Sequence, residues 1–239
     1  MVALTGFDSW LHLGAAAGIL AAAQLVYMTY GFGAGMLALG LLALVAPSIQ
    51  DAVVMLLLVS LPIELAVIRS VQRDVRWRSV MLIALGVLVG IPLGAALLRA
   101  GRPVVLLWIL SVSFIAIGAF FVVLPERARV RWPAWSRPLV GVASGFLSGV
   151  LGIGGPPLVA YLQLQGLSKT QIRGNLIAVF LLISLTRVPT YALGGLITLP
   201  RLTASAVVLP AALLGAWVGT RIHLGLGERT DRKSTRLNS

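Results

Sequence analysis

Apolar residues fill most of the chain in nine runs, which short polar links separate. A helix needs about 20 apolar residues to cross the hydrocarbon of a bilayer, so the longer runs predict transmembrane helices. Two runs are too short to cross upright, 32–46 and 155–165, and each directly follows a glycine-rich break. The predicted fold class is therefore all-α, a polytopic integral membrane helical bundle with broken helices. The nine runs cover residues 11–30, 32–46, 52–68, 80–98, 103–124, 138–152, 155–165, 174–194 and 203–222.

The composition supports a membrane protein and excludes several other classes. Of the 239 residues, 59% are hydrophobic and 11% are charged, whereas an ordinary soluble domain carries about 25% charged residues. Such a chain cannot cover its surface with polar groups. This excludes a soluble enzyme or a nucleic-acid-binding protein and makes the lipid bilayer the expected partner. With no cysteine and two distant histidines, the sequence predicts neither a metal site nor a cofactor.

Basic residues gather in the links between the apolar runs. Links 69–79 and 125–137 each carry four arginines against one acidic residue. Positively charged links stay on the cytoplasmic side of the membrane, so both links should face the cytoplasm. Two spans lie between them, 80–98 and 103–124, and this even number agrees with a common side.

Two glycine patterns occur twice and in the same order. The stretch Gly31 to Gly35 resembles Gly152 to Pro156, and Gly90 to Gly94 resembles Gly215 to Gly219, at offsets of 121 to 125 residues. The pattern indicates a duplicated unit. Glycines four residues apart permit close approach of two helices, so the later pair in each unit predicts packing within the chain. Contact within a homo-oligomer is the alternative.

The repeat divides a single membrane domain, residues 1–225, into two units. Repeat one covers about 11–124, a cytoplasmic linker covers 125–137, and repeat two covers about 138–225. Equivalent links of the two units differ in charge: a link rich in arginine in one unit has a poorly charged counterpart in the other. Opposite charge bias at matching positions predicts inverted topology.

The repeat also predicts an apolar span near residues 227–249, the partner of 103–124. The chain instead ends in the polar sequence GERTDRKSTRLNS. We therefore expect that the native last helix is missing from this sequence and that residues 231–239 are a sequence artefact. A genuine basic tail is the alternative, and in either case the tail is set aside for fold reasoning.

The glycine-rich break in the second half is the first candidate site. Three glycines around Ile153, followed by two prolines, cannot sustain a helix. A break at membrane depth is tolerated only in a protein interior or a water-lined cavity. The half-helix that begins near Pro156 would direct its positive dipole end at an anion. Close helix packing by small residues is the alternative. The backbone groups expected at the site are those of Gly152, Gly154, Gly155, Pro156, Leu158 and Val159, with Gly33 and Gly35 from the first half.

Few charged or amide side chains lie within the apolar runs. Glu64 and Arg187 occupy matching places in the two repeats, at an offset of 123, and ionisable groups at such depth are functional candidates. They are predicted to form an ion pair, or Arg187 binds an anion, or its guanidinium extends to the interface. Asn175 is predicted either to hydrogen-bond an oxyanion or to join helices. Asp51 is expected to cap the helix that follows it.

The stretch Gly141 to Leu162, GVASGFLSGVLGIGGPPLVAYL, resembles the signature of the TauE/SafE sulfite exporter family of bacterial inner-membrane transporters. In the first half the motif is degenerate, because no proline follows Gly35. The similarity extends to Arg173-Gly174-Asn175, Tyr191, Gly195 and the pair Gly215 and Gly219.

The resemblance implies secondary transport of a small sulfur-containing anion, such as sulfite or a sulfonate. Export across the bacterial inner membrane by alternating access is expected, with no enzymatic activity. The two repeats would rock around an anion held by half-helix N-termini and Arg187. A passive anion channel is one alternative. A membrane-embedded enzyme or assembly factor is another, although the spans offer few polar residues for catalysis.

Overall fold

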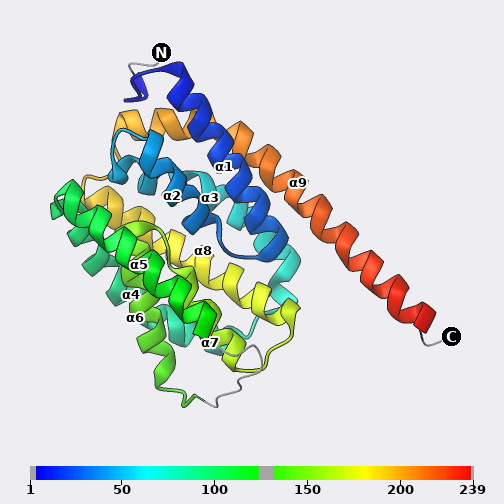
Figure 1. Ribbon diagram of the computed structural model, residues 1–239. Helices are drawn as coiled ribbons and strands as arrows, with labels where there is room; N and C mark the ends of the chain where they lie inside the picture. The colour runs from blue at the N-terminus through cyan, green and yellow to red at the C-terminus, as the bar shows by residue number, and fades with distance from the viewer. Residues whose placement is uncertain (1–3, 124–131, 238–239) are drawn as a thin grey trace.

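The computed structural model describes residues 4–123 and 132–237, which form nine α-helices, one short 3-10 helix and no β-strand (Figure 1). Each helix coincides with one of the nine predicted apolar runs, which confirms the all-helical fold. The helices are α1 (Trp10–Tyr30), α2 (Ala34–Val45), α3 (Ile49–Val71), η2 (Gln72–Asp74), α4 (Trp77–Ala100), α5 (Pro103–Val123), α6 (Ser136–Leu151), α7 (Gly155–Leu164), α8 (Lys169–Leu193) and α9 (Leu199–Leu237).

Two predicted segments lie partly outside the described residues. Of the linker 125–137, residues 125–131 are outside, and α6 already begins at Ser136. Of the tail 231–239, the last two residues are outside, and the backbone of α9 continues to Leu237, where the helix projects away from the bundle (Figure 1). The origin of the tail stays a prediction.

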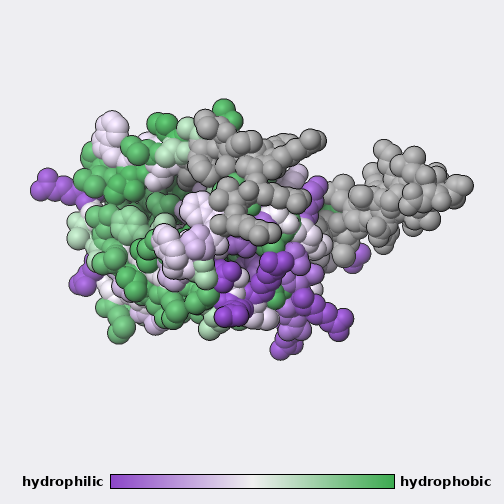
Figure 2. Space-filling model, turned by 90° about the horizontal axis from the view of Figure 1, so that it is seen from below, coloured by the Kyte–Doolittle hydropathy of each residue, from purple (hydrophilic) through white to green (hydrophobic). Residues whose placement is uncertain are grey.

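Five helices are long and apolar enough to cross a membrane: Trp10–Tyr30, Ile49–Asp74, Trp77–Ala100, Lys169–Leu193 and Leu199–Ile222. At most half of each apolar window is buried within the protein. Many large hydrophobic side chains are therefore exposed, as lipid-facing positions require. Seen from below, hydrophobic residues cover one part of the surface and hydrophilic residues gather over another (Figure 2). The chain is a multi-pass membrane protein.

Serine side chains begin three of the helices. Ser9, Ser48 and Ser168 each accept a hydrogen bond from the backbone amide three residues later. The prediction that Asp51 caps its helix is therefore wrong, because the helix begins at Ile49 with Ser48 as its N-cap. A serine oxygen reaches the free amides of the first turn as well as a carboxylate does. Asp51 lies inside that turn, where the positive end of the helix favours its charge.

The helix breaks lie at the predicted glycines. Gly31 ends α1 and Gly33 precedes α2, with φ angles of 85° and 95°, and Gly152 ends α6 with φ of 73°. Residues with a side chain rarely adopt this left-handed backbone conformation, which explains the glycines at these three positions. The helix α7 then begins with two prolines in its first turn, where the missing N–H groups cost no helical hydrogen bond.

The two halves pack through equivalent glycines. A Cβ atom added at Gly90 of α4 would collide with the carbonyl group of Val142 in α6, and one added at Gly215 of α9 would collide with that of Ala21 in α1. The same correspondence repeats one turn later, where Gly94 meets Phe146 and Gly219 meets Leu25. Packing within the chain is thus confirmed for both glycine pairs. The fourth helix of each half lies against, and parallel to, the first helix of the other half.

The third helices of the two halves, α3 and α8, run antiparallel to each other. Near one end, Arg187 of α8 donates a hydrogen bond to the carbonyl of Val53 in α3. Near the other end, Gly174 of α8 lies against the carbonyl of Val71 in α3. Opposite direction of equivalent helices is what inverted repeats require, so the architecture is consistent with that prediction.

Candidate functional site

The two glycine breaks meet at a central cavity of about 60 Å³. A Cβ atom at Gly35 would lie 2.7 Å from the carbonyl oxygen of Gly152, so the backbones of the two breaks are in direct contact. The first halves of α2 and α7 open onto the cavity, and α3 and α8 complete it. The lining comprises Tyr27, Phe32, Gly33, Ala34, Gly35, Met36, Leu56, Leu57, Ser60, Glu64, Ser148, Gly152, Ile153, Gly154, Gly155, Pro156, Phe180, Ile183, Ser184 and Arg187.

Arg187 provides the cation of this cavity. Its side chain is only 4% exposed, so it does not extend to the membrane interface. Its Nη2 atom donates to the carbonyl oxygen of Val53 at 3.3 Å, and it lies 3.5 Å from the place that a Cβ atom on Gly152 would occupy. Glycine at position 152 therefore allows the guanidinium group to approach the broken backbone.

Tyr191 holds Arg187 in this position. The Nη2 and Nε atoms of Arg187 donate to the Tyr191 hydroxyl at 3.1 Å and 3.3 Å, and that hydroxyl donates to the carbonyl of Gly149 at 2.7 Å. The guanidinium carbon also lies 4.9 Å from the centre of the Tyr191 ring, a cation–π contact. Sequence reasoning did not place Tyr191 at the site. Its spacing of four residues from Arg187 puts both on one face of a helix and could have identified it.

Glu64 lines the same cavity as Arg187 but forms no ion pair with it. Within the described parts of the chain, the one ion pair joins Asp51 to Arg201. The Glu64 side chain is 5% exposed, and its Oε2 atom has no hydrogen-bond partner among the described residues. Two serines line the cavity with it: Ser60 lies one turn earlier on α3, and Ser184 lies on α8. The cavity thus contains one cation and one acid at separate places.

The two breaks differ in how many backbone amides lack a partner within the helix and can donate to an anion. At the start of α2, the amide of Leu37 donates to the carbonyl of Gly33 at 3.0 Å and closes the first turn. The amides of Ala34, Gly35 and Met36 precede that bond and have no partner within the helix. In α7, two of the corresponding positions are prolines and carry no N–H. The first half therefore offers the larger set of anion donors, although its motif is the degenerate one.

Three predicted site residues do not line the central cavity. Leu158 and Val159 are buried in a hydrophobic cluster. Asn175 is 1% exposed, and its amide joins helices: Oδ1 accepts from the backbone N–H of Arg76 at 3.0 Å, and Nδ2 donates to the carbonyl of Gln171 at 2.6 Å. The structure therefore gives Asn175 the helix-joining contacts that were the alternative prediction.

A larger vestibule of about 590 Å³ lies next to the central cavity, and Phe32 lines both. The vestibule is bounded by the ends of α1 and α3 and by the start of α8. Two basic residues, Lys169 and Arg173, and one acid, Asp74, line it. Asp74 belongs to the basic link 69–79, so the vestibule lies at the end of the molecule that the charge pattern assigns to the cytoplasm.

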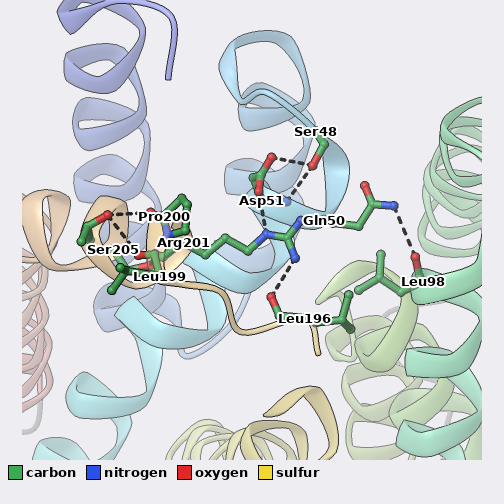
Figure 3. A network of polar contacts seen from close by, with 10 residues as sticks. Ser48, Gln50, Asp51, Leu98, Leu196, Leu199, Pro200, Arg201 and Ser205 are labelled. Atoms are coloured by element: carbon green, nitrogen blue, oxygen red, sulfur yellow. Dashed lines mark hydrogen bonds and ion pairs between the residues drawn. The ribbon is translucent and has the colours of Figure 1, made fainter. Parts of the chain in front are cut away.

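The opposite end is closed by a network of polar contacts (Figure 3). Arg201 of α9 donates through Nε to Asp51 of α3 at 2.6 Å and through Nη1 to the carbonyl of Leu196 at 2.7 Å. The Ser48 hydroxyl donates to the other carboxylate oxygen of Asp51 at 2.6 Å. Because Asp51 belongs to the first half and Arg201 to the second, this network joins the two halves.

These features define a class of protein: a polytopic helical membrane transporter, in which two broken helices meet at a buried, cation-containing cavity. No group of histidine, cysteine or acidic residues among the described residues could hold a metal ion. Residues 15–235 match the model of the family described as sulfite exporter TauE/SafE, and the chain belongs to this family. It is therefore a transporter and not an enzyme.

A curated relative and a search of solved structures complete the comparison. The chain is 28% identical over 209 residues to a protein of Cupriavidus necator named probable sulfite/organosulfonate exporter TauE, with 85% of this chain and 81% of the relative covered. No solved structure matches the chain.

Proposed function

We propose that the protein exports a small sulfur-containing anion, sulfite or an organosulfonate, from the cytoplasm across the bacterial inner membrane. The observation that carries this proposal is the buried guanidinium of Arg187 against the broken backbone at Gly152. Tyr191 and Val53 occupy the Nε and Nη2 atoms of Arg187, so Nη1 is the group that offers charge-assisted hydrogen bonds to an oxyanion. The free amides at the start of α2 add further donors. The name of the Cupriavidus necator relative supports the same class of anion.

We further propose that transport proceeds by alternating access. Two observations support this mechanism: at one end a wide vestibule lies next to the central cavity and shares Phe32 with it, and at the other end the Asp51–Arg201 pair joins the two halves. The structure then corresponds to the state open to the cytoplasm, with Phe32 between vestibule and cavity. Rocking of one repeat against the other along the glycine-packed helix pairs would close the vestibule and separate the ion pair.

Counterflow of labelled sulfite and labelled methanesulfonate into proteoliposomes tests this function. Vesicles loaded with the unlabelled anion should accumulate the labelled anion above its external concentration, because a carrier exchanges the two. A passive channel, the alternative from sequence, would only equilibrate the label. Absence of any protein-dependent movement of both anions would overturn the proposed function.

Substitution of Arg187 tests the site. Arg187→Ala should reduce counterflow at least tenfold, because the anion loses its charge-assisted hydrogen bonds. Arg187→Lys should retain a small part of the activity, since lysine keeps the charge but loses the planar guanidinium that Tyr191 and Val53 hold in place. Arg221→Ala is the matched control, because Arg221 is an exposed arginine that contacts Trp217 outside the cavity. Unaltered flux in Arg187→Ala would remove Arg187 from the anion site.

A further inference from the structure

Glu64 is a buried acid whose presence in the cavity is not explained by anion binding alone. An exporter of anions gains nothing from a second negative charge in its binding cavity. The Glu64 carboxyl nevertheless lines the same cavity as Arg187, with its Oε2 atom buried and without a hydrogen-bond partner among the described residues. An ionised carboxylate in such a place lacks the solvation that it has in water, whereas a protonated carboxyl does not need it.

The groups around Glu64 come from three helices. Ser60 lies on its own helix, α3; Tyr27 faces it from α1; and Ser184 and Arg187 face it from α8. Arg187 is the charged group among these, and its guanidinium is held by Tyr191 and Val53 and not by Glu64. Arg173, at the start of α8, interacts with Tyr27. The lining residues from α2 and α7 carry no titratable side chain.

The charges in the cavity can be counted for the empty and the loaded state. With Glu64 ionised and no anion, Arg187 and Glu64 sum to zero. A bound monovalent anion would bring the sum to minus one, and a proton on Glu64 returns it to zero. A net charge enclosed in a membrane interior is costly, and alternating access passes through a state in which the cavity, empty or loaded, is shut to both sides. Both states are neutral only where the anion and a proton bind together and leave together.

We propose that Glu64 is the proton-binding site of this transporter and that one proton on its carboxyl accompanies each monovalent anion. The inference rests on the proposed function of the same cavity. The proton comes from water in the vestibule when the anion binds, and it returns to water on the other side when the anion leaves. Transport of a monovalent anion is then electroneutral, and the outward concentration gradient of the anion drives its export.

Methanesulfonate is the probe that tests the coupling. A sulfonate is the anion of a strong acid and keeps its single charge over the working pH range, so any proton movement belongs to the protein. In proteoliposomes of the full chain, efflux of methanesulfonate should make the lumen more alkaline by one proton per anion, as read by an internal pH-sensitive dye. A potassium-diffusion potential should change the initial rate of efflux less than twofold.

The variant Glu64→Gln keeps the shape of the side chain but cannot take part in proton exchange. Its net efflux should move no protons and should become dependent on the imposed potential, because the empty cavity now retains the uncompensated charge of Arg187. Alkaline pH should raise the KM of the wild type for methanesulfonate and should not raise that of Glu64→Gln. Asp8→Asn is the matched control, since Asp8 is an exposed acid outside the cavity, and it should behave as the wild type.

The outcomes separate this proposal from the proposed function. Counterflow of methanesulfonate without proton movement in the wild type would overturn the role of Glu64 and leave anion transport intact. Proton coupling that persists in Glu64→Gln would also overturn it. The wild-type stoichiometry decides the matter even where Glu64→Gln fails to fold. Absence of counterflow of both anions would instead count against the proposed function.

Discussion

The two ends of the molecule join the same pair of repeats with different chemistry. At the closed end, Asp51 of α3 pairs with Arg201 of α9. At the vestibule end, Asn175 of α8 binds the backbone N–H of Arg76, which directly precedes α4. Arg76 and Arg201 are equivalent, since each lies fourteen residues before a packing glycine, Gly90 or Gly215. One end is thus fastened by a pair of charges and the other by a neutral amide.

The N3 positions of α3 and α8 account for part of this difference. Ser48 and Ser168 begin the two helices in the same way, and the residue three positions later is Asp51 in one and Gln171 in the other. The Gln171 side chain accepts a hydrogen bond from the N-cap backbone N–H and completes a capping box. Asp51 accepts both from the Ser48 hydroxyl and from Arg201. The acid at N3 of α3 therefore joins its helix start to the other repeat, whereas the amide at N3 of α8 completes a capping box.

The largest loss of stability is expected at the glycine contacts, which are alike in the two halves. Gly90→Ala and Gly215→Ala each place a Cβ atom against a backbone carbonyl of the facing helix, which cannot move aside without separating the helices. We expect each to destabilise the protein by about 3 kcal/mol, the upper part of the range for overpacked positions. Thermal unfolding in detergent measures this loss.

Gly18→Ala is the matched control for these glycine variants. Gly18 also lies on an apolar helix, α1, but a Cβ atom there meets nothing within 4 Å. Alanine should therefore be neutral or slightly stabilising. If Gly90→Ala were as stable as Gly18→Ala, the close helix contact would be absent, and the equivalence of the two glycine interfaces would be lost.

Most of the architecture follows from the sequence because it depends on local properties. Apolar runs fix the spans, and glycine with proline fixes the breaks. Even the meeting of Glu64 and Arg187 in one cavity follows from their equivalent positions in two repeats. The N-cap of α3 was misassigned because Ser48 and Asp51 are both good capping residues, and only the turn of the backbone decides between them.

The absence of Leu158 and Asn175 from the cavity lining has geometric causes. Leu158 is the fourth residue of α7, so its amide lies beyond the free amides of the first turn and bonds within the helix. Asn175 precedes Arg187 by twelve residues, or about 18 Å along the helix axis, too far for both to line one small cavity. Helical geometry could have excluded both residues. The contact of Asn175 with Arg76 depends on tertiary packing, which the sequence does not show.

Substitution of Asn175 tests the neutral contact at the vestibule end. Asn175→Ala should destabilise the protein by about 1 to 2 kcal/mol, because the part-buried backbone N–H of Arg76 loses its acceptor. The KM for sulfite should stay within about twofold of the wild type, because the amide is already occupied and lies outside the cavity. Measurement of thermal unfolding together with KM separates these effects. A large rise in KM with unchanged stability would return Asn175 to the anion site.

The smallest loss of stability is expected at the charged end, although its ion pair is short. Side chains of Arg201 and Asp51 are 17% and 22% exposed, so water offers each charge a partial substitute. A cycle of Asp51→Asn, Arg201→Gln and the double variant should give a coupling energy of about 1 kcal/mol, and added salt should reduce it. Thermal unfolding in detergent gives the stabilities. If alternating access separates this pair in every cycle, Arg201→Gln should lose stability without losing counterflow. A variant that stays stable but no longer exchanges anions would show that the closed end does more than hold the repeats together.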